Sequence, residues 1–256
     1  MKLLILVDYD IVLHRTVFSC NNHPYPLSDE EKLNGLAFAH RLLLDKIKSI
    51  SDSFKCSKPK ILYVLSGTGN FRKDLYPAYK AHRKQKPDCF DLFKDRVEST
   101  LNNLVLSFGQ EADDEIGIYS AYYQAKGYEI VIMSIDSDLK MISCHHYNLN
   151  KDTIEFVDKE TAIKNFYKKL LTGDVADNVP GVKRIGKIKA MKVDSMTILQ
   201  AWEHVKQLYS GQNNQLPLEL VAQLLWVRRK PFEYFKIDEH DKDILVYSDE
   251  CAKLKE

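Results

Sequence analysis

The sequence predicts an α/β fold built on a parallel sheet, and this prediction depends on short apolar runs that alternate with helical segments. The runs cover residues 3–7, 61–65 and 130–135, and they consist largely of Ile, Leu and Val. Short uncharged runs of this kind are typical of strands buried on both faces of a sheet. When such strands alternate with helices, the usual arrangement is a parallel sheet covered by those helices.

The predicted helices lie between the apolar runs. Ser28 and Glu31 have the spacing of a capping box, and the leucines that follow over residues 33–50 recur at helical spacing. Residues 111–125 form a second helical pattern, which Gly127 ends. Each helix connects two of the predicted strands.

The chain has 256 residues, which favours a large domain with a smaller region beside it. After about residue 170 the strand signal fades, and helical segments punctuated by Gly and Pro dominate. We therefore expect a sheet domain over residues 1–170 and a helical region over residues 171–256.

Cysteine usage and hydropathy predict a cytoplasmic protein with no membrane role. The 5 cysteines are scattered and form no CxxC pair, which favours reduced thiols. The start, MKLLILVDYD, has a short apolar run followed at once by acids, so we interpret it as a strand and not as a signal peptide. No apolar stretch approaches the length that crosses a membrane.

The charge distribution indicates a polyanionic partner although the formal net charge is only +1. One basic block covers residues 72–86, where Asp74 is the lone acid, and another covers residues 183–192, which contain no acid. Basic blocks separated from acidic ones are what an enzyme needs when it holds both phosphates and metal cations.

Aspartates follow the first and third apolar runs at the points where the predicted strands end. Asp8 and Asp10 follow the first run, and Asp136 and Asp138 follow the third. Because the carboxyl ends of parallel strands meet at one edge of a sheet, we expect these two pairs to converge.

Further acids lie near predicted helix ends. Glu111, Asp113 and Asp114 open the second predicted helix, and Asp174 and Asp177 lie in the sequence GDVADN. Each group alone has an ordinary explanation, because acids are favoured in the first turn of a helix and Asp is a common cap and loop residue. If these acids cluster in the fold, metal binding becomes a better explanation than capping or loop formation. Unit charges about 4 Å apart repel by about 4 kcal/mol at an effective dielectric near 20, so several carboxylates need cations.

Taken in order, these motifs resemble the bacteriophage 5′-to-3′ exonucleases and flap endonucleases, which are related to the 5′ nuclease domain of bacterial DNA polymerase I. The most specific matches are FRxxxxPxYKxxR, from Phe71 to Arg83, and GDxxDNxPG, from Gly173 to Gly181. The resemblance implies a PIN-like central parallel sheet flanked by helices, a helical arch around residues 72–100, and a C-terminal helix-three-turn-helix region that binds duplex DNA. It also implies metal-dependent cleavage of DNA near free 5′ ends and at 5′ flaps during replication.

The resemblance assigns metal binding to the acids. The implied ligands are Asp8, Glu111, Asp113, Asp114, Asp136, Asp138, Asp174 and Asp177. Among them, Glu111, Asp113 and Asp136 match the positions nearest a first ion, and Asp174 and Asp177 match those nearer a second, while Asp10 has no clear counterpart. Oxygen ligands select hard ions, so we expect two Mg²⁺ ions, with Mn²⁺ as a substitute.

The resemblance assigns DNA contacts to the basic blocks. Lys80 and Arg83, assisted by Arg72, are expected to engage the scissile phosphate. Tyr79 is expected to stack on a base, with packing as the alternative role for Tyr79. The predicted helix-three-turn-helix contacts are Gly181, Lys183, Arg184, Gly186 and Lys187. Its glycines allow close approach of phosphates, and in the family its carbonyls can also hold K⁺.

The chain departs from the family pattern near the predicted site. Relatives often have an aspartate at the end of the second strand, where this chain has Ser66 or Gly67, so we expect a raised Mg²⁺ requirement. Tyr9 replaces the small residue that usually follows the first aspartate. Arg184 stands where the family usually has a glycine.

Other functions remain open at this point. A DNA-binding protein of the same fold that has lost cleavage is one alternative, and a PIN-like ribonuclease is the other, although such ribonucleases generally lack the hairpin at residues 181–190. The expected partner is DNA with a 5′ flap or a free 5′ end, and RNA–DNA hybrids also fit. We expect a monomer.

Overall fold

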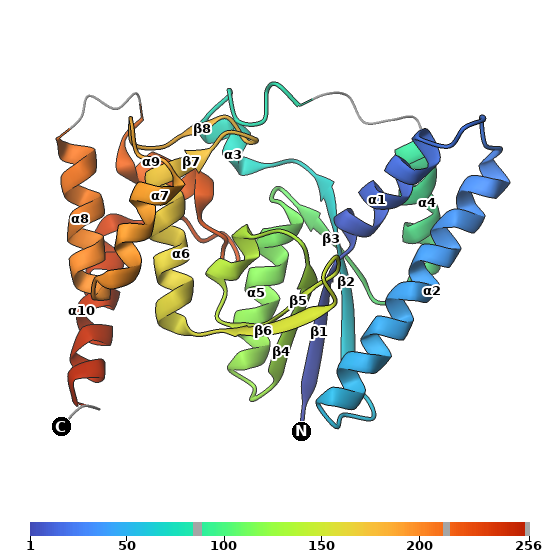
Figure 1. Cartoon of the computed structure of the whole chain (residues 1–256), viewed down its shortest axis with the longest axis horizontal. Helices are drawn as coiled ribbons and strands as arrows, with labels where there is room; N and C mark the ends of the chain where they lie inside the picture. Colours follow the sequence, from blue (N-terminus) through green and yellow to red (C-terminus); the bar gives the residue numbers. More distant parts are fainter. Residues whose placement is uncertain (84–88, 212–215, 254–256) are drawn as a thin grey trace. The chain divides into compact units, whose positions relative to one another are not determined.

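The computed structural model describes residues 1–83, 89–211 and 216–253 and divides into two compact units (Figure 1). The first unit contains Met1–Gly69, Lys84–Asp136 and Cys144–Phe156, and the second contains Asn70–Arg83, Ser137–Ser143 and Val157–Glu256. The break in the last part of the chain therefore falls near residue 157, earlier than the predicted boundary at residue 170.

A six-stranded sheet forms the centre of the first unit, in the order β3-β2-β1-β4-β5-β6. Its strands are β1 (Leu3–Asp8), β2 (Lys60–Thr68), β3 (Leu104–Phe108), β4 (Glu129–Ser134), β5 (Cys144–Asn148) and β6 (Thr153–Val157). The pairs formed by β1, β2, β3, β4 and β5 are parallel, which confirms the predicted fold class. Every residue of β1 is buried, and this explains its continuous apolar run.

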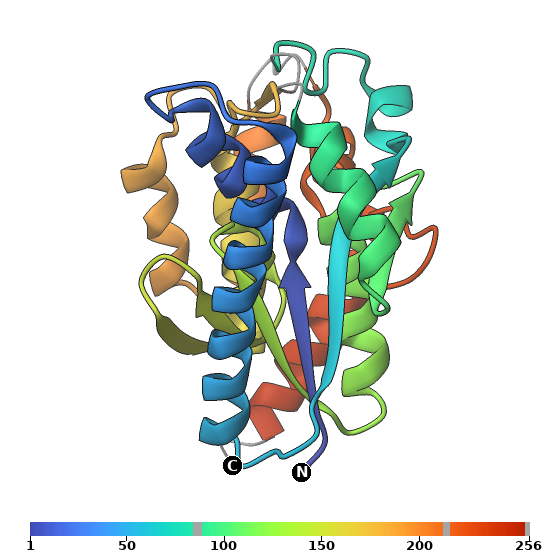
Figure 2. The same ribbon diagram turned by 90° about the vertical axis from the view of Figure 1, so that its right-hand side faces the viewer.

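Helices cover both faces of this sheet (Figure 2). They are α1 (Tyr9–Asn21), α2 (Asp29–Ser53), α4 (Cys89–Thr100) and α5 (Ala112–Gln124). Helices α1, α2 and α4 pack on one another and share a core with alternate residues of β1, including Leu3, Ile5 and Val7. Helix α5 packs on the other face, against β1, β2, β3 and β4.

The predicted capping box at the start of α2 is confirmed. The backbone N–H of Ser28 donates to Glu31 Oε2 over 2.7 Å, and the Glu31 N–H donates to Ser28 Oγ over 3.3 Å. These bonds satisfy two amides that have no partner within the helix, so the helix begins where the sequence predicts.

The parallel register brings several strand ends to one edge of the sheet. Asp8 of β1 lies opposite Val64 of β2, and Val7 lies opposite Met133 of β4. Residues that follow β1 and β4 are therefore neighbours, although they are far apart in the sequence.

The second unit is mainly helical. Its elements are α3 (Phe71–Leu75), η1 (Asp138–Met141), α6 (Lys159–Thr172), β7 (Gly173–Asp174), β8 (Val179–Pro180), α7 (Lys187–Ala190), η2 (Met191–Ser195), α8 (Ile198–Ser210), α9 (Leu218–Leu225) and α10 (Ile237–Lys253). Helix α6 is central, because it packs against η1, η2, α7, α8 and α9. None of the helices in the described ranges is long and apolar enough to cross a membrane.

An aromatic cluster fills the core of the second unit. The Tyr167 ring stacks on Trp202 at 5.3 Å, and the His240 ring lies edge-on to Trp202 at 4.8 Å. The Tyr167 hydroxyl is hydrogen-bonded to His240 Nε2 over 2.8 Å. Burial lowers the pKa of His240 to about 4.

The buried His240 predicts a loss of stability in acid. The unfolded chain binds a proton at a higher pH than the folded chain does, so the contribution of His240 is present above about pH 6.5 and is lost as the pH falls toward 4. We expect a decrease of about 2 kcal/mol in the free energy of unfolding from this group. Urea unfolding at pH 7 and pH 4.5 measures it.

The control is His240→Gln, which cannot titrate and retains a group that can hydrogen-bond Tyr167. Its unfolding free energy should change less between the two pH values than that of the wild type. An identical pH dependence in both proteins would contradict the assignment.

Candidate active site

Asp8 and Asp136 lie at the carboxyl ends of neighbouring strands and are linked through Ser134. Asp8 ends β1 and is only 4% exposed. The Ser134 hydroxyl donates to Asp8 Oδ2 over 2.7 Å, and Ser134 Oγ accepts the Asp136 N–H over 2.9 Å. The ends of the first and third apolar runs are thus neighbours in the first unit and carry Asp8 and Asp136, whereas Asp138 belongs to the second unit.

The electrostatics of Asp8 favour a bound cation. Burial, followed by the charges of Asp10 and Asp136, raises the pKa of Asp8 to about 7, while the Ser134 hydrogen bond opposes the shift. A buried carboxylate beside two others is costly to ionise, and a divalent ion would remove that cost. The side chains at this edge therefore fit a divalent metal by their chemistry.

The acids that open α5 have different environments. Glu111 caps the helix, and its backbone N–H donates to Asp114 Oδ2 over 3.2 Å. Asp114 is fully buried, whereas Glu111 and Asp113 are half-buried. The ordinary explanation, helix capping, thus applies to Asp114, while Glu111 and Asp113 are more accessible.

Ser66 joins the start of α5 to the carboxyl end of β2. Its hydroxyl accepts the Ala112 N–H over 3.4 Å, and its own N–H donates to Asp10 Oδ2 over 3.1 Å. Ser66 contributes no charge, as the sequence indicates. The same edge of the first unit therefore carries Asp8, Asp10, Ser66 and the beginning of α5.

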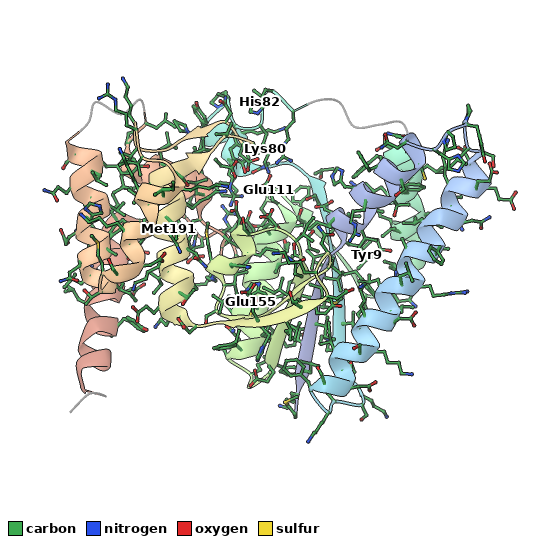
Figure 3. The ribbon with its side chains drawn as sticks, viewed as in Figure 1. Tyr9, Lys80, His82, Glu111, Glu155 and Met191 are labelled. Atoms are coloured by element: carbon green, nitrogen blue, oxygen red, sulfur yellow. The ribbon has the colours of Figure 1, made fainter. Side chains whose placement is uncertain are left out.

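Tyr9 directs its side chain away from these acids. It is 1% exposed, its hydroxyl is hydrogen-bonded to His40 Nδ1 over 3.0 Å, and its ring lies edge-on to Tyr63 at 5.5 Å (Figure 3). A large residue is accommodated after Asp8 because it fills the core between the sheet and α2.

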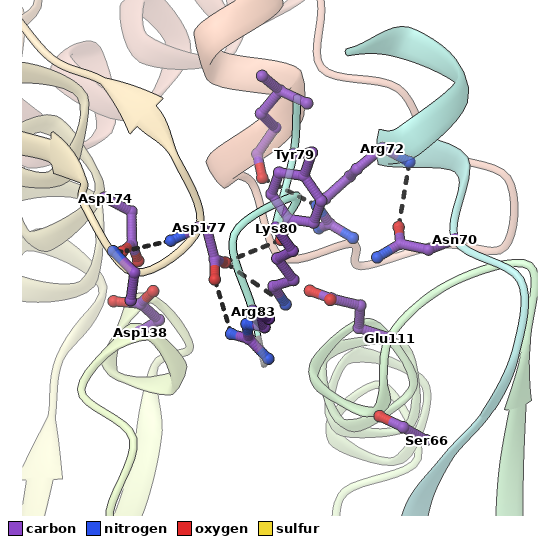
Figure 4. Close-up of polar contacts among 12 residues, drawn as sticks. Ser66, Asn70, Arg72, Tyr79, Lys80, Arg83, Glu111, Asp138, Asp174 and Asp177 are labelled. Atoms are coloured by element: carbon purple, nitrogen blue, oxygen red, sulfur yellow. Dashed lines mark hydrogen bonds and ion pairs between the residues drawn. The ribbon is translucent and has the colours of Figure 1, made fainter. Parts of the chain in front are cut away.

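In the second unit, a lysine lies between two of the predicted metal ligands. Lys169 Nζ donates to Asp138 Oδ1 over 2.8 Å and to Asp174 Oδ2 over 2.7 Å (Figure 4). Burial alone would lower the pKa of Lys169, but Asp138 and Asp174 raise it above its ordinary value. Asp174 also accepts the N–H groups of Ala176 and Asp177. Burial alone would raise its pKa, but Lys169 and these N–H groups hold it below its ordinary value.

Asp177 holds the segment that carries Lys80 and Arg83. It accepts the Tyr79 hydroxyl at 2.9 Å and an Arg83 guanidinium N–H at 2.7 Å, and Lys80 Nζ lies 3.4 Å away (Figure 4). The Lys80 backbone N–H donates to the Asp177 carbonyl over 2.9 Å. In this structure, Asp177 therefore forms ion pairs with Lys80 and Arg83, the two cations that are predicted to bind a phosphate.

The segment from residue 181 to 187 has a close backbone contact at Gly181 and a left-handed backbone at Arg184. A β-carbon on Gly181 would lie 2.3 Å from the carbonyl carbon of Thr172, so a larger residue cannot be accommodated without movement. Arg184 has a φ of +66°, the conformation that glycine adopts most easily. Lys183, Arg184 and Lys187 are exposed.

As placed, no group of three or more His, Cys, Asp or Glu side chains within residues 1–83, 89–211 and 216–253 is arranged to hold a metal ion. The predicted metal ligands are divided between the units. The first unit contains Asp8, Glu111, Asp113, Asp114 and Asp136, and the second unit contains Asp138, Asp174 and Asp177. In the second unit, Asp138, Asp174 and Asp177 form ion pairs with lysine and arginine side chains.

A family model decides the identity of the chain. The model described as 5′-3′ exonuclease, N-terminal resolvase-like domain matches residues 3–168. The chain belongs to this family. Its predicted activity class, a 5′-3′ exonuclease that hydrolyses phosphodiester bonds, agrees with this membership.

Two curated relatives of this 5′-3′ exonuclease family chain carry the family's name, and a third is a DNA polymerase I. A 5′-3′ exonuclease of Buchnera aphidicola is 29% identical over 82% of this chain and 74% of its own length. One from Aquifex aeolicus is 24% identical over 100% of this chain and 91% of its own length. The DNA polymerase I of Rhizobium leguminosarum is 32% identical over 54% of this chain, but only 15% of that polymerase is covered.

Solved structures share the fold. The bacteriophage T5 5′-exonuclease with bound divalent zinc has a TM-score of 0.56 and 18% identity, covering 88% of this chain and 89% of its own. The T5 flap endonuclease in complex with DNA and metal ions has a TM-score of 0.55 and 18% identity, covering 95% of this chain and 98% of its own. The catalytic core of Rad2 with DNA has a TM-score of 0.51 and 12% identity over 92% of this chain and 82% of its own.

Two predicted DNA contacts of this 5′-3′ exonuclease family chain have structural roles here. Tyr79 is 2% exposed, so its ring is not available to stack on a base. Arg72 is 3% exposed and donates to the carbonyls of Leu224 (2.8 Å) and Trp226 (2.7 Å), with its guanidinium 4.6 Å from the Phe71 ring centre. In this structure Arg72 holds α3 to the end of α9, and its assistance at the phosphate stays a prediction.

The arch predicted around residues 72–100 covers α3, the segment that follows it to Arg83, and α4. Helix α4 packs on α1 and α2 and so belongs to the helical layer of the first unit. Residues 84–88 of the predicted arch lie outside the described ranges. The described candidate for the gateway is therefore the segment from α3 to Arg83.

Lys169 and Ser134 were not predicted from the sequence as members of the site. The available signal for Lys169 was its place in the last turn of a helix that runs into the GDVADN motif. Ser134 lies two residues before Asp136, where a short hydroxyl side chain can bond the following turn.

Arg184 gives a testable prediction about the hairpin. Arg184→Gly should raise the free energy of unfolding by up to about 1 kcal/mol, because a left-handed backbone costs an L-residue about 1–2 kcal/mol and the greater freedom of unfolded glycine offsets part of the gain. Duplex affinity should fall, with the salt slope reduced by about 1. Urea unfolding and salt-dependent binding measure these effects.

Arg184→Lys is the control, because it keeps the charge and the backbone cost. It should retain the stability and most of the duplex affinity of the wild type. A clear loss of stability in Arg184→Gly would contradict the strain argument.

Proposed function

We propose that this chain is a divalent-metal-dependent nuclease that acts as a 5′-to-3′ exonuclease and cuts 5′ flaps in DNA. The observation that carries the proposal is the edge of the sheet where Asp8, Asp10 and Asp136 meet. Burial and these neighbouring charges raise the pKa of Asp8 to about 7, so the edge favours a bound cation. The T5 relatives crystallised with metal ions and with DNA support this proposal.

Two groups of acids would hold the ions. Asp8, Glu111, Asp113 and Asp136 would hold the first, with Asp114 supporting them from its buried position. Asp138, Asp174 and Asp177 would hold the second. Bound Mg²⁺, or Mn²⁺ in its place, supplies an activated water and stabilises the leaving oxygen. Ser134 keeps Asp8 and Asp136 side by side for this task.

Lys80 and Arg83 would bind the phosphate that is cut. Both now contact the Asp177 carboxylate, which resembles a phosphate in charge and in its acceptor oxygens. An incoming phosphate can take the same donors, and Asp177 is then released toward other cations. Lys169 stabilises Asp138 and Asp174 as carboxylates until that exchange.

The hairpin from residue 181 to 187 would bind duplex phosphates without regard to sequence. Exposed Lys183, Arg184 and Lys187 supply the positive charge, and the absence of a β-carbon at Gly181 allows the close turn. The proposal also includes K⁺ bound by the hairpin carbonyls and acceptance of a 5′ strand made of RNA. We further propose that the protein acts as a monomer in the cytoplasm of a bacterial host.

A flap-binding protein without cleavage is the rival function, and Ser66 favours it because it brings no charge to the end of β2.

A panel of 5′-labelled substrates in Mg²⁺ tests the two functions. The substrates are a flap duplex, a blunt duplex, the same duplex with a hairpin-closed 5′ end, and a flap whose 5′ strand is RNA. We expect cutting wherever a 5′ end is free and none at the closed end. Equal cutting of the closed end would show an endonuclease of another kind.

A further inference from the structure

The loop between α9 and α10 presents one aromatic ring to solvent. Its residues 226–236 have the sequence WVRRKPFEYFK, which combines aromatic and basic side chains. Phe232 is 86% exposed, and its ring contacts no other aromatic ring of the described residues. Phe235 is instead only 5% exposed, and the Trp226 ring lies 4.9 Å from that of Phe166. Packing therefore explains Trp226 and Phe235 but not Phe232.

The Phe232 ring lies on a tight turn whose backbone does not suit it. The Glu233 N–H donates to the Lys230 carbonyl over 3.2 Å, so residues 230–233 form a β-turn with Pro231 and Phe232 at its centre. Phe232 has a φ of +59°, and a residue with positive φ after a proline in a turn is usually Gly or Asn. A bulky side chain that is both strained and unpacked does not serve stability, which directs attention to function.

Glu233 holds this turn in place. Its carboxylate accepts the Trp226 indole N–H over 3.2 Å and the Lys230 N–H over 3.3 Å. Its carbonyl accepts the Nε–H of Arg228 over 2.8 Å, and Arg228 is only 4% exposed. Because the turn is already ordered, a ligand of the exposed ring would bind without the entropic cost of ordering it.

The same loop packs on α3, the start of the candidate gateway segment. The Arg228 guanidinium carbon lies 3.6 Å from the Phe71 ring centre, and the Tyr234 ring lies edge-on to Phe71 at 5.4 Å. Arg72 of α3 also bonds two carbonyls at the end of α9. All these residues belong to the second unit. The loop is therefore tied to the segment that leads to Lys80.

Lys230 places a positive charge in the turn that carries the ring. It is exposed, and it forms no ion pair with a described residue, whereas Lys236 pairs with Glu239 at 2.8 Å. Proteins bind single-stranded nucleic acid with this combination, because a ring stacks on a base while a cation binds a phosphate. A protein partner would need a wider surface, since a stable interface covers about 800 Å² on each side.

We propose that Phe232 stacks on an unpaired base of the 5′ flap and that Lys230 binds an adjacent phosphate. The inference rests on the proposed function, because it gives a second contact to the strand whose phosphate Lys80 and Arg83 would bind. The contact is independent of sequence, since every base has a face on which a ring can stack.

The experiment measures binding of labelled duplexes by fluorescence anisotropy in EDTA, and the wild type is also assayed for flap cutting in Mg²⁺. One duplex has an ordinary 5′ flap, and the other has a flap made of abasic nucleotides. Phe232→Ala removes the ring, Phe232→Trp keeps a stacking surface, and Phe232→Gly removes the ring together with the backbone strain. Lys230→Ala removes the charge. Phe38→Ala, at a position on α2 that is 61% exposed, is the matched control.

We expect the abasic flap and Phe232→Ala each to weaken binding about tenfold, with no further loss when they are combined. Phe232→Trp and Phe38→Ala should bind like the wild type, and Lys230→Ala should reduce the salt slope by about 1. Phe232→Gly should bind as weakly as Phe232→Ala, yet its midpoint of urea unfolding should be no lower than that of the wild type.

Wild-type binding by Phe232→Ala, with Mg²⁺-dependent cutting by the wild type, would overturn the inference and leave the proposed function intact. Additive losses from Phe232→Ala and the abasic flap would show that the ring contacts something other than a base, such as a protein partner. A lower urea midpoint for Phe232→Gly would show that the ring serves packing. A wild type that binds the flap through Phe232 but never cuts it would instead overturn the proposed nuclease activity.

Discussion

Asp136→Ala should reduce Mg²⁺-dependent cleavage of a 5′ flap by roughly a thousandfold, a loss of about 4 kcal/mol in transition-state stabilisation. Asp136 lies beside the buried Asp8, and its N–H bonds to the Ser134 hydroxyl that holds Asp8. Without its carboxylate, the edge of the sheet loses a ligand from the proposed first ion. Single-turnover cleavage of a labelled flap at several Mg²⁺ concentrations measures the effect.

The control for this variant is Asp45→Ala, which removes an exposed aspartate of α2. Its cleavage rate should equal that of the wild type. Circular dichroism should show that both variants are folded. A folded Asp136→Ala protein that cuts at the wild-type rate would contradict the assignment of Asp136 to the metal site.

Lys80→Ala should slow cleavage by about a hundredfold, because the transition-state phosphate loses one positioned donor. Lys80 Nζ lies 3.4 Å from Asp177 Oδ2, within reach of the group that a substrate phosphate would replace. Alanine keeps the β-carbon, so the cost of the positive φ at Lys80, +56°, is unchanged and does not confuse the result. The measured quantities are kcat and KM on the flap duplex, with the larger change expected in kcat.

Lys73→Ala is the matched control for Lys80→Ala. Lys73 is an exposed lysine in α3, a short distance along the same segment, and its removal should leave kcat unchanged. A loss of equal size in both variants would indicate that only the total charge of the segment matters, and the specific role of Lys80 would then be wrong.

The central strands were predictable because their physical cause is local. The apolar runs of β1, β2 and β4 are buried on both faces, so their composition alone identifies them. Strands β3, β5 and β6 lie outside the three predicted apolar runs, and all three are short and partly exposed. The division of the chain into two units was also not predictable from the hydrophobic pattern, because Asn70–Arg83 belongs to the second unit although the segments on both sides of it belong to the first.

The candidate site was predictable residue by residue but not in its pairings. Motif spacing identifies Asp174 and Asp177, yet it does not show that Lys169 bonds the first or that Tyr79 and Arg83 bond the second. Contacts between residues about 100 positions apart depend on the whole fold. The burial of Arg72 and Tyr79 likewise follows from packing that the FRxxxxPxYKxxR spacing does not encode.

The most direct test of a metal-dependent 5′ nuclease follows binding and cutting of one 5′-labelled flap duplex by the wild type, in EDTA, Mg²⁺ and Mn²⁺. We expect binding in all three conditions, and cutting near the flap junction only when a metal is present. Tight binding with no cutting in either Mg²⁺ or Mn²⁺ would contradict the nuclease assignment and favour the flap-binding alternative, with the neutral Ser66 as the first residue to change.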